Sequence, residues 1–135
     1  MEQLILTELL QIDNPKGNIY HGMKKSDEGF NGFGEAYFSI INKGCIKGWK
    51  KHTRMTLNLI VPFGEVEFII HNEKTNKFSK FDLSQKNYQR LTIPPNFWLA
   101  FRGIEEVNIV LNIANIEHDA SESINWDIKE ISYEW

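Results

Sequence analysis

The stretch CIKGWKKHTRMTLNLIVPFGEVEFIIHN, residues 45–72, places a charged segment before two apolar segments. Apolar side chains recur at every second position in residues 55–61 and again in residues 65–71. Residues at alternate positions of a β-strand share one face of the sheet, so this pattern predicts two half-buried strands. A turn over residues 62–64 separates them, and the charged residues 46–52 are expected to form the strand that precedes them.

The same alternation predicts further short strands on either side of this stretch. These are residues 34–42, 78–83, 89–93, 97–102 and 107–113. The patterns of residues 4–12 and 123–135 fit either a helix or a strand. Pro94 and Pro95 cannot lie in a central strand, because each lacks the amide donor of the sheet ladder, so they mark a rigid turn. Short strands with turns every ~8–12 residues predict an all-β sandwich or barrel that takes up residues 1–135 as one domain.

The composition narrows the class of protein. The chain has 135 residues, of which 41% are hydrophobic and 24% charged, as is typical of one folded domain. The net charge of −3 argues against a nucleic-acid partner held by bulk positive charge. The single cysteine, Cys45, allows no internal disulfide and fits a reducing compartment. The N-terminus carries acids where a signal peptide needs Lys or Arg, and no apolar run approaches the ~20 residues of a membrane span. We therefore expect a cytoplasmic protein without a nucleic-acid or membrane partner.

Four segments carry a resemblance to a known family. They are GEAYFSIINKGCIKGWKKH (34–52), FGEVEFIIHN (63–72), LTIPPNFWLAF (91–101) and ESINWD (122–127). In this order they resemble the cupin barrel, and within the cupins the dTDP-4-dehydrorhamnose 3,5-epimerase (RmlC-like) family of nucleotide-sugar enzymes. The resemblance implies a single cupin jelly-roll barrel of two facing antiparallel sheets. It also implies a homodimer and a nucleotide-linked keto-deoxysugar as the small-molecule partner.

The resemblance also bears on metal binding. The ligand positions of metal-binding cupins match Lys50, His52, Leu57 and Leu99 in this chain. Only His52 is a credible metal ligand, whereas a catalytic metal needs about three ligands from the protein. We therefore expect no metal and no cofactor.

The metal-free epimerases are similar to this chain in a different way. Their base histidine lies in a segment that residues 47–50 match, which puts Lys50 at the base position, and His52 matches a second histidine of related sequences. The family's acid tyrosine falls at about Leu111, and its histidine after the proline turn falls at Leu99. The resemblance thus implies His52 as the base that removes a proton next to a keto group, with Lys50 stabilising the enolate.

The residue types at these two positions suit that chemistry. Lys50 and His52 are two residues apart, so both side chains lie on one face of a regular strand. An imidazole with an ordinary pKa of about 6.5 can take and return a proton near neutral pH. The alternative is a solvated histidine at a strand end beside a lysine on a solvated edge.

Four further residues are candidates for binding the substrate. Lys47 matches the phosphate-binding arginine of the family and Arg54 has the strand parity of His52, so both are expected to hold a pyrophosphate. Trp98 follows the proline turn and is expected to stack on a nucleobase or a sugar. Asn112 alternates with apolar neighbours and is expected to point into the pocket. Solvent-facing charges, a packed core tryptophan and a surface asparagine are the alternatives.

Together these residues predict a metal-free cupin that acts on a nucleotide-linked keto-deoxysugar, as an epimerase or isomerase in cell-envelope polysaccharide biosynthesis. The alternative is a non-catalytic cupin that binds a sugar or a sugar nucleotide as a sensor or accessory subunit. A third possibility is a structural partner in a larger complex. The residues that line the barrel distinguish these three possibilities. A polar ligand requires a lining of Lys50, His52, Arg54 and Asn112, whereas a closed scaffold would be filled by Leu57, Leu99 and Leu111.

Overall fold

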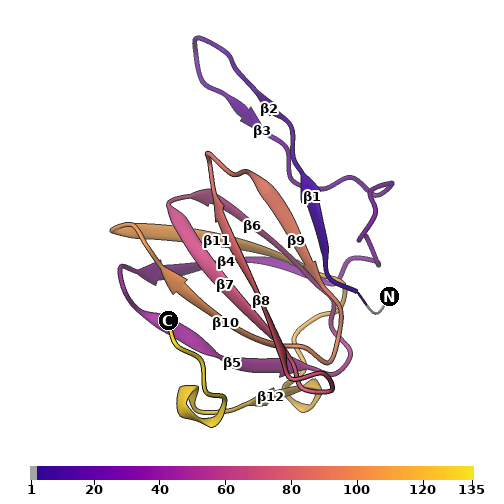
Figure 1. The fold of residues 1–135 in the computed structure, drawn as a ribbon. Helices are drawn as coiled ribbons and strands as arrows, with labels where there is room; N and C mark the ends of the chain where they lie inside the picture. The colour runs from indigo at the N-terminus through magenta and orange to yellow at the C-terminus, as the bar shows by residue number, and fades with distance from the viewer. Residues whose placement is uncertain (1–2) are drawn as a thin grey trace.

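The computed structural model describes residues 3–135, which form two facing five-stranded antiparallel sheets (Figure 1). The first sheet has the order β1 (Ile5–Glu8), β9 (Gln89–Ile93), β6 (Leu57–Phe63), β11 (Val107–Ala114) and β4 (Glu35–Asn42). The second has the order β12 (Ser123–Asn125), β5 (Ile46–His52), β10 (Trp98–Gly103), β7 (Glu65–Asn72) and β8 (Lys77–Ser84). The short 3₁₀ helices η1 (Ala120–Glu122) and η2 (Ile128–Glu130) flank β12.

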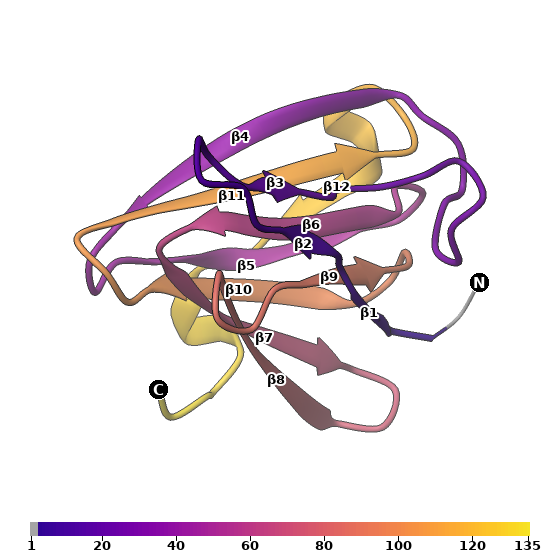
Figure 2. The ribbon, with the colours of Figure 1, turned by 90° about the horizontal axis from the view of Figure 1, so that it is seen from above.

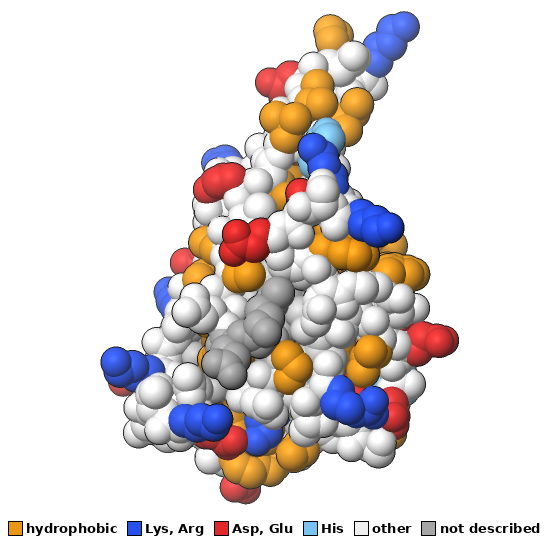
Figure 3. Space-filling view, turned by 90° about the vertical axis from the view of Figure 1, so that its right-hand side faces the viewer, with side chains coloured by type: hydrophobic (Ala, Val, Ile, Leu, Met, Phe, Trp, Pro, Cys, Tyr) orange, Lys and Arg blue, Asp and Glu red, His pale blue; other side chains and the backbone are white. Residues whose placement is uncertain are grey.

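A separate hairpin projects from the barrel. Its strands are β2 (Gln11–Ile12) and β3 (Ile19–Tyr20), which pair only with each other among the described residues. Figure 3 shows the hairpin standing above the body, with hydrophobic side chains along it. Leu10, Ile12 and Ile19 are exposed there.

The expectation of an all-β fold with two facing sheets is confirmed, and each of the eight expected strands is present. The expected turn over residues 62–64 is shorter than predicted, because β6 continues to Phe63 and only Gly64, with φ of 80°, turns the chain. The N-terminal segment forms strands β1 and β2 and not a helix. The C-terminal segment forms only the short strand β12 and η2.

The main hydrophobic core lies between the two sheets. It includes Leu57, Leu59 and Val61 from β6, Leu91 and Ile93 from β9, Val66, Phe68 and Ile70 from β7, and Leu83 from β8. These residues recur at every second position because that spacing places them on the inner face of each sheet. Buried and exposed residues do not alternate in β6, because Asn58 and Ile60 on its outer face are buried as well.

The outer face of the first sheet is partly covered by the segment of residues 22–29. The Asn58 amide donates to the Gly29 carbonyl at 3.1 Å. The fully buried Arg90 guanidinium donates to the Gly22 carbonyl at 2.7 Å and to the Asp27 carboxylate at 3.2 Å. Strands β4 and β11 form the other half of this outer face, and they lie side by side along one edge of the barrel (Figure 2).

The outer face of the second sheet is covered by the C-terminal segment. Trp49, Ile69, Trp98 and Ala100 form a second apolar cluster with Ile131. Within residues 3–135, no helix has the length and apolar character that crossing a bilayer requires.

Candidate active site

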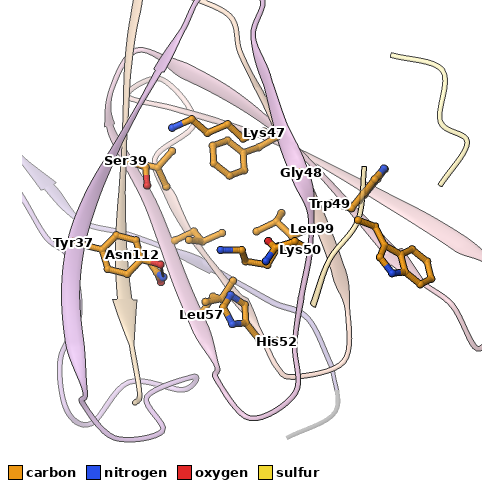
Figure 4. A pocket seen from close by; sticks show the side chains of 15 residues that line it. Tyr37, Ser39, Lys47, Gly48, Trp49, Lys50, His52, Leu57, Leu99 and Asn112 are labelled. Carbon is orange, nitrogen blue, oxygen red and sulfur yellow. Dashed lines mark hydrogen bonds between the residues drawn. The ribbon is translucent and has the colours of Figure 1, made fainter. Parts of the chain in front are cut away.

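A cavity of about 270 Å³ lies between the two sheets and is partly open to solvent. The polar side chains among the residues that line it are Tyr37, Ser39, Lys47, Lys50, His52, Asn112 and Asn125. The apolar part of the lining comes from Leu57, Leu59, Leu99, Phe101 and Val110. In Figure 4, Lys50 and His52 lie on one wall, and Tyr37 and Asn112 lie on the opposite wall. The cavity is therefore polar on two facing sides and apolar at its base.

Strand β5 supplies the cationic wall because it contains a β-bulge. Leu99 of β10 pairs with Lys50, but Ala100 pairs with Gly48, so Trp49 is the extra residue. An extra residue shifts the alternation of side chains by one position. Lys47 and Lys50, three residues apart, therefore both line the cavity. The Lys47 ammonium crosses the opening and donates to the carbonyl of Ile40 in β4 at 2.8 Å.

His52 at the end of β5 is held by a buried carboxylate. Its Nδ1 atom lies 2.5 Å from Oε1 of Glu122, whose side chain is 1% exposed. Glu122 ends η1, immediately before β12, and β12 pairs with β5 such that Ser123 lies opposite His52. The carboxylate occupies Nδ1, so the lone pair on Nε2 is the one available to a substrate. A histidine oriented in this way can act as a general base.

The other Glu122 oxygen is anchored to the backbone. Oε2 accepts from the amides of Arg54 and Met55, each at 3.2 Å. Burial acts to raise the pKa of Glu122, but the hydrogen bonds from His52 and from these two amides outweigh it, so the pKa lies below its ordinary value of 4.5. The carboxylate is thus ionised at neutral pH and is the fixed negative partner of the imidazole.

The wall opposite His52 carries a tyrosine that sequence analysis did not select. Tyr37 in β4 lies directly across from Asn112 in β11, and the Asn112 amide nitrogen donates to the Tyr37 hydroxyl at 2.9 Å. The signal for Tyr37 was present, because residues 37, 39 and 41 alternate on the inner face of an expected strand. Leu111, the position matched to the family's tyrosine, lies against the segment of residues 23–33 and is not part of the cavity lining.

The structure brings together four of the six sequence-predicted site residues. Lys47, Lys50, His52 and Asn112 all line the cavity. Leu57 and Leu99 line it as well, so the lining is mixed and not closed by leucine.

Arg54 and Trp98 lie elsewhere. Arg54 follows β5 in a bend, and its guanidinium contacts the Asp119 carboxylate at 2.6 Å. This contact holds the end of β5 to the turn that carries Glu122. Hydrogen bonds from Ser121, and then from Arg54, lower the pKa of Asp119 to about 2. The free ring face expected at Trp98 is absent, because Trp98 is 1% exposed and stacks on Trp126 at 4.2 Å between ring centroids.

Of the two tryptophans that line the cavity, Trp49 is buried and Trp126 is exposed. Trp126 is 43% exposed and uses one ring face against Trp98. The segment that resembles the family at residues 122–127 therefore contributes both the carboxylate behind His52 and an aromatic side chain at the cavity.

Solved structures with this fold are dTDP-sugar isomerases and RmlC-like epimerases. The dTDP sugar isomerase from Desulfovibrio desulfuricans G20 has a TM-score of 0.93 and 29% identity over 99% of this chain and 91% of its own. QdtA, a sugar 3,4-ketoisomerase from Thermoanaerobacterium thermosaccharolyticum in complex with TDP, has a TM-score of 0.78 and 20% identity over 90% and 86%. RmlC from Legionella pneumophila, in complex with dTDP-4-keto-L-rhamnose, has a TM-score of 0.81 and 15% identity over 98% and 78%.

No protein-family model and no curated protein matches the sequence. The similarity of structure defines the class: the chain is an all-β jelly-roll cupin with the RmlC-like fold. The resemblance to dTDP-4-dehydrorhamnose 3,5-epimerase-related enzymes is thereby confirmed.

We predict that Glu122→Gln lowers stability in a pH-dependent way. The lowered pKa of Glu122 means that its contribution is present above the ordinary value of 4.5 and is lost as the pH falls through the folded-state value. The variant should lose about 1–3 kcal/mol of unfolding free energy at pH 7, the range of hydrogen bonds to a charged group. Urea denaturation between pH 3 and pH 7 measures this, and the difference should shrink at the acidic end.

The matched control is Glu106→Gln, because Glu106 is exposed and its contact with Lys43 is a surface ion pair. It should stay within about 0.5 kcal/mol of the parent protein throughout. A Glu122→Gln deficit that does not change with pH would contradict an ionised carboxylate.

Proposed function

We propose that this protein is a metal-free cupin enzyme that acts on a nucleotide-linked keto-deoxysugar as an epimerase or isomerase. The observation that carries the proposal is the His52–Glu122 pair, which places a base at the cavity across from Tyr37 and Asn112. We further propose that residues 1–135 act as one cytoplasmic domain in cell-envelope polysaccharide biosynthesis. The single cysteine fits a reducing compartment.

The chemistry is proton removal from a carbon next to the keto group. His52 Nε2 takes the proton, and the electron pair of the broken C–H bond forms the C=C bond of an enolate. Negative charge collects on the former carbonyl oxygen, where the Lys50 ammonium and the Tyr37 hydroxyl stabilise it. Return of a proton to the opposite face of the same carbon gives an epimer. Where that carbon carries a hydroxyl, transfer of the hydroxyl proton to the enolate oxygen and return of the C–H proton to the former carbonyl carbon gives the isomeric ketone.

The nucleotide part of the substrate would be bound by other residues that line the cavity. Lys47 would exchange its carbonyl contact with Ile40 for a pyrophosphate oxygen, a charge-assisted bond. Trp126 takes the stacking role that was expected of Trp98, because it is the tryptophan that is exposed at the cavity. The proposed role of Arg54 at the pyrophosphate requires that its guanidinium leaves Asp119.

A non-catalytic cupin that binds a sugar nucleotide is the second candidate. Lys50 and Leu99 favour it, because they occupy the positions at which the resembling enzymes carry histidines. The polar walls argue for a ligand in either case, and so against a purely structural partner. Proton exchange at the sugar separates the two candidates.

We predict that His52→Asn abolishes proton exchange without abolishing binding. TDP-4-keto-6-deoxyglucose, the ligand of one QdtA structure, is the probe. Deuterium uptake from D₂O at the sugar, followed by NMR, should fall by about 10²–10⁴-fold, the usual contribution of a general base. Thermal shift should still report binding, with about 2.7 kcal/mol of stabilisation at 100 times the dissociation constant.

The matched control for this experiment is His118→Asn, because His118 is an exposed histidine outside the cavity lining. It should exchange like the parent protein. Binding without exchange in the parent protein would favour the non-catalytic cupin. An unchanged exchange rate in His52→Asn would place the base elsewhere.

We predict that the purified protein contains no stoichiometric transition metal. Within residues 3–135 no three or more His, Cys, Asp and Glu side chains form a group that could hold one. Elemental analysis after purification without added metal should find far less than one ion per chain, and EDTA should leave proton exchange unchanged. Stoichiometric zinc, iron, nickel or manganese that is needed for exchange would refute this.

We propose that the protein is a homodimer that covers the outer face of β4 and β11. Phe38 and Ile40 are exposed on β4, an edge strand, and Val107 is exposed on β11. The C-terminal segment packs against the outer face of the second sheet, and residues of the segment 23–33 line a groove with Leu111 and Ile113 on the first. Phe38, Ile40 and Val107 remain exposed beside that groove. An exposed sheet edge with apolar side chains is a surface that association protects.

Size-exclusion chromatography with light scattering should give twice the chain mass of 15.8 kDa. Phe38→Asp should shift the protein toward the monomer, because a carboxylate would then be desolvated in the interface. Ile124→Asp is the control, since Ile124 is exposed on β12 in the other sheet. A parent protein that is monomeric at high concentration would rule out the dimer.

A further inference from the structure

The chain that follows β5 holds Glu122 at both its backbone and its side chain. The amide and the hydroxyl of Thr53 both donate to the Glu122 carbonyl oxygen, each at 2.7 Å. The amides of Arg54 and Met55 donate to the Glu122 carboxylate. Because Glu122 is the last residue of η1, its position at these donors and at the His52 ring depends on how that turn is held.

The turn η1 is held at its other end by Asp119. Oδ1 of Asp119 accepts from the Ser121 amide at 2.9 Å and from the Ser121 hydroxyl at 2.7 Å, which makes Asp119 the N-cap of η1. The Asp119 carbonyl accepts from the Glu122 amide at 3.1 Å. The other carboxylate oxygen, Oδ2, contacts Arg54. The cap uses Oδ1 alone, so it persists whether or not Arg54 leaves for a pyrophosphate.

A cap has a large effect on a turn as short as η1. The turn has three residues, and forming a first helical turn is unfavourable by itself, so little besides the cap gives it a fixed shape. Hydrogen bonds from Ser121 are the main cause of the low pKa of Asp119, about 2, so the cap is ionised and complete at neutral pH. Asp119 is exposed and does not line the cavity. Any effect of Asp119 on the site therefore acts through Glu122.

We propose that Asp119 is a positioning residue of the candidate active site. By capping η1 it holds the Glu122 carboxylate on Nδ1 of His52, and it thereby fixes the direction in which Nε2 faces the cavity. This inference rests on the proposed function in one respect, since the proton that Nε2 removes belongs to the proposed substrate. The contact between Glu122 and His52 can be measured without that substrate.

The chain offers a matched control in Asp127. Asp127 is the N-cap of η2, and its Oδ1 accepts from the Lys129 amide at 3.0 Å. Both aspartates are exposed, and both cap a turn of three residues in the same part of the chain. The two turns differ in their last residue. Glu122 is buried against His52, whereas Glu130 at the end of η2 is exposed.

NMR spectroscopy of the free protein tests the inference directly. The Nδ1–H proton of His52, identified by its loss in His52→Asn, should exchange slowly with water in the parent protein. In Asp119→Ala this exchange should be about 3–30-fold faster, because the lost cap makes local opening of η1 more frequent by that factor. Asp127→Ala should leave the exchange rate unchanged. An unchanged rate in Asp119→Ala, or an equal increase in both variants, would overturn the inference.

Asp119→Asn shows whether the cap itself is responsible. Asparagine is as good an N-cap as aspartate, because its side-chain oxygen accepts the same hydrogen bond from the backbone. The Nδ1–H exchange rate of this variant should therefore stay within about 2-fold of the parent protein. A variant with asparagine that exchanges as fast as Asp119→Ala would overturn the role of the cap.

Turnover provides a second measurement. With TDP-4-keto-6-deoxyglucose at saturation, deuterium uptake at the sugar should be about 3–30-fold slower in Asp119→Ala, and the dissociation constant of TDP should not increase, because Asp119 acts on the base and not on the nucleotide. Weaker binding of TDP with an unchanged rate at saturation would overturn the inference.

The inference and the proposed function can fail separately. A parent protein that neither binds TDP nor exchanges protons at the sugar would refute the proposed function, and the NMR comparison would still decide the role of Asp119. Normal turnover together with an unchanged Nδ1–H exchange rate in Asp119→Ala would refute the inference alone.

Discussion

The site depends on one buried carboxylate. Glu122 is almost fully excluded from solvent, and an ionised group there is tolerated only if its oxygens are fully paired. All three donors come from a short stretch of chain, namely the His52 ring and the amides of Arg54 and Met55. These hydrogen bonds therefore fix the end of β5 against η1, orient the imidazole and hold β12 at the edge of the sheet. The fold and the geometry of the candidate site thus depend on the same carboxylate.

The second determinant is the bulge in β5, which changes the charge of the cavity. In a regular strand Lys47 and Lys50 would face opposite sides, whereas the extra residue Trp49 puts both beside His52. The Lys47 and Lys50 ammonium groups share a wall with the imidazole and repel one another, although both side chains are exposed and water screens part of this repulsion. An anionic ligand relieves it, and this is the electrostatic reason to expect a diphosphate here and not a neutral sugar.

The fold can be predicted from the sequence because side-chain alternation is a local property. The expected strands, and the placing of Lys50 and His52 on one face, follow from the period of two residues that the pleat imposes. The features of the site that the sequence does not predict depend on contacts between distant parts of the chain. Glu122 lies 70 residues from His52, and nothing in the segment ESINWD marks its acid as the partner of a particular ring. Trp98 and Trp126 stack on one another, and only the packing around them buries Trp98 and leaves Trp126 exposed at the cavity.

The arrangement of the walls bears on the kind of reaction. A double epimerisation needs proton donors and acceptors on both faces of the sugar ring. Among residues 3–135, His52 is the one histidine in the cavity lining, and the position at which the resembling enzymes carry another histidine holds Leu99. The facing wall offers a phenol paired with an amide, which suits the binding of oxygens better than the removal of a carbon-bound proton. One base on one face can pass the C–H proton to the neighbouring carbon while the hydroxyl proton moves to the former carbonyl oxygen, and together these transfers move the carbonyl by one carbon. This geometry therefore favours an isomerase over a double epimerase within the proposed class.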